Sequence, residues 1–349
     1  MAAGHVEIGH EGVGRYPKKR FACWAREGYV KHRSVEGRRH VLWARQRGGS
    51  DSMSGRIPVT VVFVTRNEEA NLERSLASVH NFADQIFVVD SESSDRTVEI
   101  ARRYADDVAC LAYDHTQIIP WIFQWSLDHL SIRTEWVLIL EADQALTVGL
   151  REELASLFAR KEIRENGFYI PRRQIFRGKT IRFGGYGSKK ILKLFRKSAS
   201  SLDPKEQDTR VYVRGTTGHL RQPIEEWNKK ENAILFYLDK HLRYADAFAR
   251  EELERRRGLA FMAKPRLFGT PDERILWQKS LWYRMPLYVR PFLYFFHRYV
   301  LLLGFLDGWN GFVFHFLQAF WFRLVVDIRL SELLQALRRS TADGGPARR

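Results

Sequence analysis

Residues 58–79, PVTVVFVTRNEEANLERSLASV, join an apolar run to a polar, helix-like segment. Residues 58–65 are rich in β-branched side chains, which favour strands. In residues 71–79 the apolar side chains recur every three or four positions, which is the period of one helix face. The stretch therefore predicts a strand followed directly by a helix, the first unit of an α/β fold.

The same alternation continues along the chain. Further strands are predicted at QIFVVD (85–90), DVACLAY (107–113) and EWVLIL (135–140), and helices at DRTVEIARRY (95–104) and PWIFQWSLDHL (120–130). Strands that alternate with helices at this spacing predict a mostly parallel sheet with helices on both faces. Beyond it, residues 171–197 are basic, with glycines typical of turns between short strands, and residues 225–257 are charge-rich and helix-like.

The composition narrows the class of protein. The chain has 349 residues, a formal charge of +16 and only two cysteines, Cys23 and Cys110. A basic balance favours anionic partners such as phosphorylated substrates, acidic lipids or nucleic acid. Two cysteines imply no disulfide framework, which fits a reducing compartment. Because the N-terminus has no apolar run resembling a signal peptide, we expect a cytoplasmic protein.

Four regions follow from the changes in pattern. Residues 1–55 are basic and Gly-rich, without periodicity, and are predicted to be a disordered extension. Residues 56–258 form the α/β domain, residues 259–335 are a helical region whose later part is crowded with aromatic side chains, and residues 336–349 are predicted to be a disordered tail.

Two acids end the fourth strand in the stretch LILEADQA (138–145). Alternate residues of an extended segment point the same way, so Glu141 and Asp143 should project together. Two converging carboxylates repel each other unless a cation lies between them, and a divalent ion is the usual solution. The alternative is an acidic turn that caps the helix beginning near Gly149.

Polar side chains also follow the first two strands. They are Thr65, Asn67 and Glu68 after the first strand, and Asp90 and Ser91 after the second. Ligands of parallel sheets bind at the carboxyl ends of strands, where these residues should meet. Helix capping is the alternative for Asn67, Glu68 and Ser91. It explains Asp90 less well, because Asp90 lies several residues before its helix and could accept hydrogen bonds from a base or ribose.

Three segments together resemble a known family: VTRNEEANLERSLASV (64–79), VVDSESSDRTVEIARRY (88–104) and LILEADQ (138–144). In this order they resemble glycosyltransferase family 2, the inverting GT-A enzymes, and most of all the bacterial cell-surface polysaccharide and lipopolysaccharide-core glycosyltransferases. The resemblance covers residues 57 to about 330. It implies a GT-A-type, Rossmann-like sheet in a catalytic domain over 56–258. No G-x-G-x-x-G motif or P-loop accompanies the strands.

The resemblance also implies roles for individual residues. Thr65, Asn67 and Glu68 would line the pocket for the base of a nucleotide-sugar donor, with Ser91 nearby, and Asp90 would contact the base, uracil. The family's D-x-D motif falls on Glu141-Ala142-Asp143. Asp143 would ligate Mn²⁺ or Mg²⁺, and Glu141 would contact ribose, sugar or the metal. Glutamate in the first position keeps the charge but changes its reach.

A glycosyl transfer also needs a base for the acceptor hydroxyl. Four acids beyond the basic segment could serve, and each could instead be a solvated loop charge: Glu206, Asp208, Glu225 and Glu226. The resemblance favours Asp208, which precedes the Y-V-x-G run, although the V-H-E sequence of many relatives is absent. Arg172 and Lys190 are candidates for binding diphosphates, with exposed strand faces as the alternative.

Two aromatic runs, PFLYFFHRYVLLLGFL (291–306) and GFVFHFLQAFWFRLVV (311–326), lie near the C-terminus. Each has 16 residues, fewer than the roughly 20 needed to span a bilayer, and is interrupted by histidine and arginine. Aromatic and basic side chains suit the membrane interface, so we expect helices over 285–330 that lie on the membrane. A buried helical hairpin is the alternative.

The leading hypothesis is an inverting, metal-dependent glycosyltransferase at the inner face of the cell membrane. It would move a hexose from a nucleotide-diphosphate sugar, UDP-linked, to a lipid-linked or membrane glycan acceptor in cell-surface polysaccharide synthesis. A nucleotidyltransferase is the first alternative, but TRNEE lacks the glycine loop such enzymes use. A basic protein that binds membranes or nucleic acid is the second. No recognised nucleic-acid module occurs, so nucleic acid is not an expected partner.

Overall fold

The structure is a computed structural model that describes residues 55–112, 119–203, 206–259 and 264–343, with the side chains of 340–343 excepted. The predicted disordered extension, 1–55, and Cys23 therefore lie outside the described residues, apart from Gly55.

The first half of the sheet is parallel and follows the predicted alternation. Its strands have the spatial order β3-β2-β1-β4, and every neighbouring pair among them is parallel. The strands are β1 (Ile57–Thr65), β2 (Ala83–Asp90), β3 (Asp107–Cys110) and β4 (Trp136–Glu141). The helices that alternate with them are α1 (Leu72–Ala77), α2 (Thr97–Tyr104), α3 (Ile119–His129) and, after β4, α4 (Val148–Phe158). The predicted α/β class is confirmed.

The central strand β1 explains why its sequence is almost continuously apolar. Strands β2 and β4 flank it, and helices cover both faces, so both sets of alternate side chains are buried. Phe63 and its alternate neighbours pack against α1, α2 and α4 in one core cluster. Val62 and Val64 pack against α3 in the other. This packing on both faces fixes where the strand ends, and so where Thr65 lies.

The second half of the sheet is mixed. Strand β4 pairs with β8 (Lys190–Arg196), which runs antiparallel to β4 and to β6 (Gly167–Phe176). Strand β12 (Ile224–Glu226) runs parallel to β6 and antiparallel to β5 (Gln144–Leu146). Smaller elements complete this half: β7 (Lys179–Ile181) and β11 (Thr217–His219) on β6, the pair β9 (Ser200–Leu202) and β10 (Val211–Val213), and η1 (Lys197–Ala199) and η2 (Lys229–Asn232).

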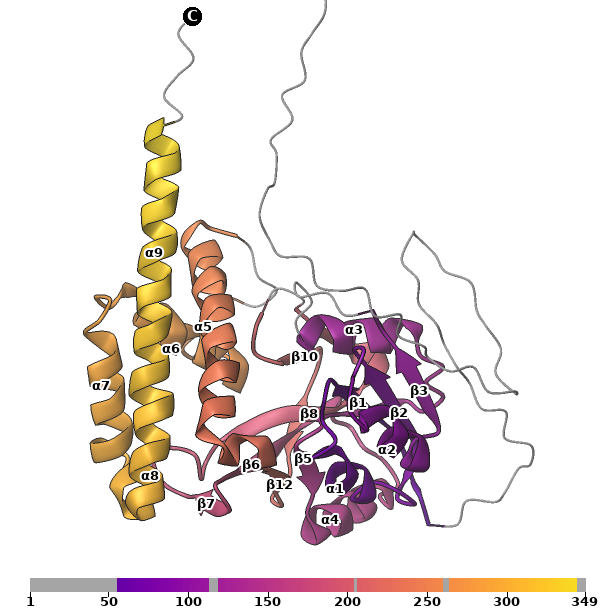
Figure 1. The fold of residues 1–349 in the computed structure, drawn as a ribbon. Helices are drawn as coiled ribbons and strands as arrows, with labels where there is room; N and C mark the ends of the chain where they lie inside the picture. Colours follow the sequence, from indigo (N-terminus) through magenta and orange to yellow (C-terminus); the bar gives the residue numbers. More distant parts are fainter. Residues whose placement is uncertain (1–54, 113–118, 204–205, 260–263, 344–349) are drawn as a thin grey trace, which may run out of the picture.

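A helical bundle lies beside the sheet domain (Figure 1). It contains α5 (Ile234–Arg256), α6 (Pro271–Arg284), α7 (Arg290–Phe296), η3 (His297–Leu301), η4 (Gly304–Asp307), α8 (Gly308–His315), η5 (Phe316–Trp321) and α9 (Phe322–Asp343). Segments η3 and η5 are π-helical, so their turns are wider than α-helical ones.

Helix α9 corrects one sequence-based boundary. It continues to Asp343, so residues 336–343 are helical rather than part of a disordered tail, while 344–349 lie outside the described residues. The sequence pattern does not indicate this, because this end of the helix is polar and projects beyond the bundle (Figure 1). Helix α5 packs along α9 through Ala245 and Ala249, so the boundary proposed at 258 separates α5 from a helix that it contacts.

A buried arginine joins three helices of the bundle. Arg290, at the start of α7, has 0% of its surface exposed. Its guanidinium donates to Asp327 of α9 at 2.5 and 2.8 Å and to Glu252 of α5 at 2.9 and 3.0 Å. The Asp327 carboxylate also accepts from the backbone N–H of Tyr288 at 2.9 Å. This cation thus lies between two buried carboxylates from different helices, one of which, Glu252, also pairs with Arg256 at 2.7 Å.

We expect Arg290→Ala to lower the free energy of unfolding by about 3–5 kcal/mol, because it leaves the buried Asp327 carboxylate without its cation and leaves Glu252 with Arg256 alone. Arg243→Ala is the matched control, since Arg243 forms an exposed pair with Asp239 one turn away on α5. That change should cost about 0.5 kcal/mol or less. Urea denaturation of the two variants measures both values, and equal losses would contradict a structural role for the Arg290 cluster.

Candidate active site

The loops that follow β1 and β2 hold each other through the residues singled out by sequence. Thr65 Oγ1 donates to Asp90 Oδ1 at 3.0 Å. The Asp90 carboxylate also accepts from the backbone N–H and the hydroxyl of Ser93 at 2.8 and 2.5 Å. Asn67 Oδ1 accepts from the backbone N–H of Ser94 at 2.8 Å, and the Asn67 N–H donates to Ser93 Oγ at 2.8 Å. The two strand ends therefore form one connected polar surface.

Asp90 is buried at the end of β2. Burial raises the pKa of Asp90 above its ordinary value, and the hydrogen bonds from Ser93 and Thr65 oppose this by favouring the carboxylate. Ser91 is also buried, and its N–H donates to the Thr65 carbonyl at 2.9 Å. A buried acid with its own local donors is a fixed hydrogen-bond acceptor, the kind of group that can select one edge of a base.

Glu68 links this surface to a segment far along the chain. Its carboxylate accepts from Lys230 Nζ at 2.7 Å and from the side-chain amide of Asn71 at 2.8 Å. Asn71 in turn donates to the side chain of buried Asn228 at 3.0 Å and accepts from the Lys229 N–H at 2.9 Å. The segment before α5 is thereby fixed against the first strand end, and Glu68 is committed to a structural contact as well as being available to a ligand.

Glu141 and Asp143 lie where sequence predicts, at the end of β4 and in the turn to β5. Glu141 Oε1 accepts from Lys193 Nζ at 3.1 Å, and Lys193 is only 2% exposed. The Asp143 carbonyl accepts from Arg74 at 2.6 Å and from the Trp227 N–H at 2.9 Å, which fixes the backbone of the turn. This anchoring holds the turn that carries the two acids in one conformation.

The Asp143 carboxylate lies among other acids. Burial and the nearby carboxylates of Glu226, Glu141 and Glu68 raise the pKa of Asp143 to about 8, while Lys240 of α5 opposes them. Among the described residues no hydrogen bond or ion pair reaches this carboxylate. A half-buried acid surrounded by like charges is electrostatically unsatisfied, and a divalent cation would relieve the repulsion.

Arg172 and Glu226 form the next part of the site. Arg172 NH1 donates to Glu226 Oε2 at 3.1 Å, and both side chains are mostly buried. Gln144 Nε2 donates to the same Glu226 oxygen at 2.8 Å. Burial opposes ionisation of Glu226, but Arg172 and Gln144 hold its pKa below the ordinary value. Glu226 is one of the four acids that the sequence leaves open, and the structure brings it beside Asp143.

Lys190 does not join this group. It is exposed at the start of β8 and lies near His219, whose pKa is lowered first by burial and then by the charge of Lys190. The preceding residue, Lys189, is the one near Arg172 and Glu226. The sequence indicates the right segment, but neighbouring residues of an extended chain face different ways, and the pattern does not specify which lysine faces the site.

Asp208 lies farther along, in the loop before β10. It accepts from Lys279 Nζ of α6 at 2.7 Å and from Arg210 at 3.1 Å. Burial opposes ionisation, yet these cations hold the pKa of Asp208 well below its ordinary value. The other two candidates differ: Glu206 is buried and paired with Arg255 at 2.9 Å, and Glu225 pairs with Arg173 at 3.0 Å. Asp208 and Glu226 are the two of the four acids whose charges act on Lys189.

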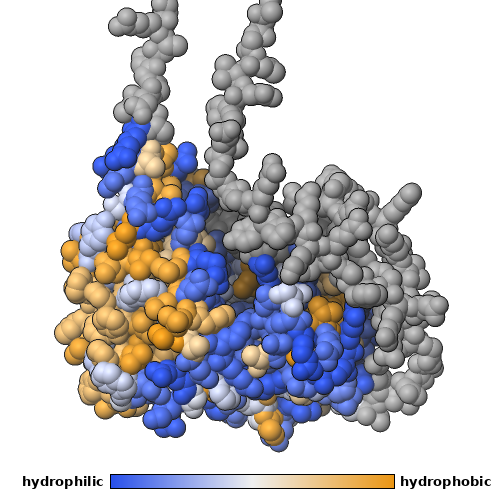
Figure 2. Space-filling view, in the orientation of Figure 1, coloured by the Kyte–Doolittle hydropathy of each residue, from blue (hydrophilic) through white to orange (hydrophobic). Residues whose placement is uncertain are grey.

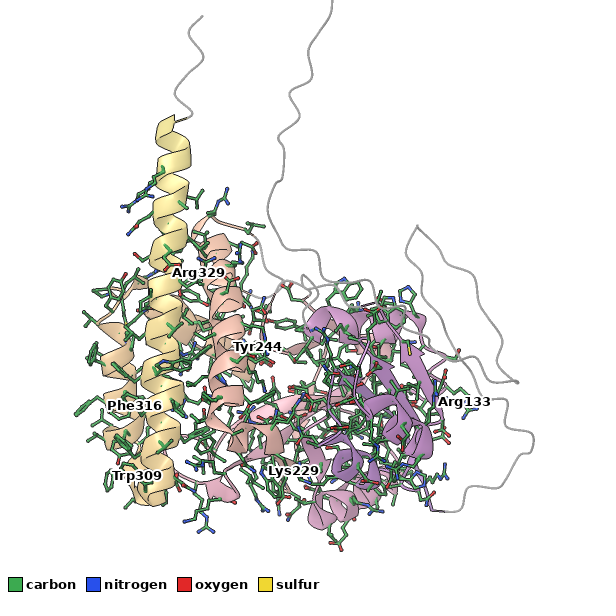
Figure 3. All side chains as sticks on the ribbon, viewed as in Figure 1. Arg133, Lys229, Tyr244, Trp309, Phe316 and Arg329 are labelled. Atoms are coloured by element: carbon green, nitrogen blue, oxygen red, sulfur yellow. The ribbon has the colours of Figure 1, made fainter. Side chains whose placement is uncertain are left out.

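Three further side chains border the acids and are missed by sequence reasoning: Arg74, Lys193 and Lys240. Arg74 lies on a helix face and Lys193 inside a strand, where either residue normally reads as a solvated charge. Tyr244 also points from α5 toward the sheet domain (Figure 3). The position of Lys193 beside the acids follows from its burial, and that of Lys240 and Tyr244 from the packing of α5. Neither feature has a local sequence signal.

Part of the sheet domain matches a known protein family. Residues 60–180 match the model of the family described as glycosyl transferase family 2. This part of the chain is therefore similar to glycosyl transferase family 2. The resemblance inferred from the three motifs is thus confirmed for this part of the chain. The family 2 segment contains Thr65, Asn67, Glu68, Asp90, Ser91, Glu141, Asp143 and Arg172. Lys189, Asp208 and Glu226 lie beyond it.

The curated relatives match over the same part. An uncharacterized glycosyltransferase of Rickettsia bellii is 35% identical over 104 residues, which are 29% of this chain and 33% of the relative. A second, RT0209 of Rickettsia typhi, is 34% identical over 104 residues, again 29% of this chain and 33% of the relative. The chain thus spans about a third of the length of the curated relatives it matches.

Solved structures resemble the chain more loosely. TarS of Staphylococcus aureus has a TM-score of 0.38 at 13% identity, covering 81% of this chain and 91% of that one. The mannosyltransferase PcManGT of Pyrobaculum calidifontis has a TM-score of 0.37 at 14% identity, covering 84% of this chain and 82% of that one.

We expect Asp90→Ala to weaken UDP binding by about ten- to a hundredfold, because it removes a charged, fixed hydrogen-bond acceptor from the family 2 domain. Mn²⁺ affinity measured without nucleotide should change little, since Asp90 is assigned to the base. Asp84→Ala on the same strand is the control, because Asp84 lies at the opposite end of β2. Titration calorimetry measures both affinities, and an unchanged UDP affinity would refute the assignment of Asp90.

Proposed function

We propose that the protein is an inverting, metal-dependent glycosyltransferase that moves a hexose from a UDP-sugar to a lipid-linked or membrane glycan acceptor, in cell-surface polysaccharide synthesis. The observation that carries the proposal is the meeting of Asp90, Glu68 and Asp143 at the carboxyl ends of three parallel strands in a family 2 domain. That edge is where parallel sheets bind ligands. The family match also favours this function over a nucleotidyltransferase or a non-enzymatic basic binding protein.

The acids at the end of β4 fit a divalent ion of the Mg²⁺ or Mn²⁺ type. Within the described ranges, no three His, Cys, Asp or Glu side chains are arranged as a complete metal cage. Mg²⁺ in nucleotide sites is commonly held by one or two carboxylates plus substrate phosphates, so a complete cage is not required. The repulsion around Asp143 supports it as the principal ligand, with Glu141 as the second. A bound ion would stabilise the negative charge that develops on the departing diphosphate.

The remaining roles follow from the same arrangement. Thr65, Asn67, Ser91 and Asp90 would bind the nucleotide, and Glu68 would border the pocket while fixed by Lys230. Arg172, which pairs with Glu226, would bind the diphosphate. We retain Lys190 only as an outer contact, because Lys189 has the closer position.

Asp208 is our assignment for the base that takes the proton from the acceptor hydroxyl. Lys279 and Arg210 keep it ionised, which is the state that a proton acceptor needs, although a low pKa makes it a weaker base. It lies near Lys189 and pairs with Lys279 of the helical bundle, a position that suits a group acting on a membrane-borne acceptor. Glu226 is the alternative within the same site.

We expect Asp143→Ala to reduce hydrolysis of a UDP-sugar by about two orders of magnitude or more, the loss typical when one electrostatic contact to a transition state is removed. Glu141→Asp should retain more activity than Glu141→Ala, because it keeps the charge. A panel of nucleotide sugars, assayed with Mn²⁺, with Mg²⁺ and with EDTA, tests donor and metal together. Full activity of Asp143→Ala in EDTA would exclude the proposed metal role, and no hydrolysis of any donor by the wild type would count against the function.

The helical bundle supports the membrane part of the proposal. Its outer side carries large apolar side chains (Figure 2), including Phe292, Leu301 and Trp309, which are 59%, 60% and 75% exposed. Trp309 and Phe316 lie on the side away from the sheet domain (Figure 3). A buried hairpin would not leave such side chains in water. Contiguous exposed apolar surface with aromatic and basic residues is typical of proteins that lie on membranes.

The bundle also contains a helical stretch long enough to cross a membrane. Within the described residues, Gly304–Arg339 is the one segment with sufficient length and apolar character, and 44% of its most apolar window is buried inside the protein. Core helices of soluble proteins have the same properties, so this stretch does not distinguish spanning from packing. Its burial against α5 supports a helix that lies on the membrane.

We expect a variant with Phe292, Leu301 and Trp309 all changed to serine to lose affinity for vesicles of phosphatidylcholine and phosphatidylglycerol by about a hundredfold. Burial of each side chain contributes about 1.5–3 kcal/mol, and partial immersion gives a fraction of this. Val148→Ser on α4 is the control, because Val148 is comparably exposed but lies on the sheet domain. Sedimentation with vesicles at low and high salt separates the apolar part from the screened, electrostatic part. Equal binding of the triple variant and the control would contradict the membrane surface.

A further inference from the structure

A second polar group lies at the junction of the sheet domain and the bundle. It consists of three cations, Lys189 in the loop before β8, Arg298 in η3 and Arg323 at the start of α9. Tyr186 and Tyr294 lie among them. We call these five residues the junction cluster. They come from three separate parts of the chain, 186–189, 294–298 and residue 323, and no local sequence motif joins them.

The tyrosine rings bring the cations together. The Arg298 guanidinium lies 4.4 Å from the centroid of the Tyr186 ring and donates to the Tyr294 hydroxyl at 2.7 Å. Arg323 lies 5.8 Å from the centroid of the Tyr294 ring, and Lys189 Nζ lies 5.8 Å from that of Tyr186. Two aromatic faces therefore hold three positive groups that would otherwise separate.

The positive charge of the cluster is not compensated by its surroundings. Within the described part of the chain, none of the three cations has a carboxylate oxygen within ion-pair distance. The acids nearest to Lys189 are Asp208 and Glu226, and each is already bound to other cations. Arg298 Nε is buried without a hydrogen-bond partner. Buried donors normally find an acceptor, so this arrangement of donors is suited to bind an anion.

The electrostatics of the neighbours agree with this geometry. Although Lys189 reaches solvent, the nearby Arg172 guanidinium lowers its pKa to about 7. Burial favours the neutral phenol of Tyr294, but Arg298 and Arg323 lower its pKa below the ordinary value. Both shifts have the direction expected where positive charge is concentrated, and both would be relieved by an anion.

The position of the cluster limits what the anion can be. On one side, Lys189 adjoins Arg172, whose N–H donates to the Lys189 carbonyl at 2.9 Å, and so reaches the proposed catalytic acids. On the other side, η3 continues into the exposed apolar chain at Val300–Leu303. A ligand that fills the junction would therefore have its charge at the cluster and an apolar part on the outer face of the bundle.

We propose that Lys189, Arg298 and Arg323 bind the phosphate of an amphiphilic acceptor whose apolar chain lies on the C-terminal helices. Arginine binds phosphate through paired N–H groups, and lysine adds a mobile point charge. This inference rests on the proposed function, because it assumes that the acceptor is membrane-borne. It adds the chemical class of the acceptor, a phosphate ester or diphosphate of a lipid, and separates its site from that of the donor.

The test uses the full-length protein with soluble probes of matched structure: farnesyl diphosphate, farnesol and inorganic pyrophosphate. Farnesyl diphosphate should bind more tightly than either of the others, because only it fills both the charged and the apolar parts. Arg298→Gln and Lys189→Gln should each weaken its binding by about ten- to a hundredfold. They should leave the affinity for farnesol unchanged, since that probe carries no charge.

Arg102→Gln is the matched control, because Arg102 is an exposed arginine on α2 with no ion pair among the described residues. Circular dichroism and the melting temperature check that the variants fold, and Lys189→Gln serves if the change at Arg298 disturbs the packing. Farnesyl diphosphate that binds no more tightly than farnesol, or equally to the variants and the control, would overturn the proposal. Tight binding of pyrophosphate that UDP displaces would also overturn it, because the cluster would then serve the donor.

The outcome is separable from that of the proposed function. UDP affinity and UDP-sugar hydrolysis depend on Asp90 and Asp143, which lie outside the junction cluster. If the wild type hydrolyses no UDP-sugar while the junction variants still have a lower affinity for farnesyl diphosphate, the anion site is supported and the proposed donor chemistry is wrong. If hydrolysis proceeds and the variants bind the lipid diphosphate normally, the acceptor site is wrong.

Discussion

The buried ion cluster of Arg290, Glu252 and Asp327 holds together the three helices that lie beside the candidate site. Arg290 belongs to α7, and its two carboxylate partners belong to α5 and α9. Helix α5 carries Lys240 and Tyr244 toward the acids of β4, while α9 carries Arg323 to the junction. An ion cluster of this depth gains little stability relative to apolar packing, but it tolerates few geometries. It therefore sets the register in which the bundle can present these side chains.

The sheet domain is predictable because its signals are local. Strands β1, β2 and β4 are buried on both faces and so read as continuous apolar runs, and each ends where the polar residues begin. Parallel topology then brings the strand ends together, so the amino-acid pattern alone is enough to group Thr65, Asp90 and Asp143. The alternation also predicts both helix layers, since α1, α2 and α4 share one face and α3 covers the other.

The rest of the site depends on pairings between distant segments, which no periodicity encodes. Glu226 reaches Asp143 only because the short strand β12 pairs with both β5 and β6. Glu68 is fixed by Lys230, 162 positions away in the sequence. Whether Lys189 or Lys190 faces the site depends on the local conformation of one loop. Polarity misleads in a different way at the C-terminus, where polar residues 336–343 continue a helix that begins in the core.

The π-helical segment η5 has a consequence for how the length of this chain can vary. A π turn holds one residue more than an α turn, and each residue of a helix adds about 100° of rotation. Loss of a single residue within Phe316–Trp321 would restore a regular helix and turn all of α9 by that angle. That rotation would break, at the same time, the contacts made by Arg323, Val326 and Asp327. A one-residue deletion in η5 should thus disturb the packing of α9 more than a conservative substitution at the same position would.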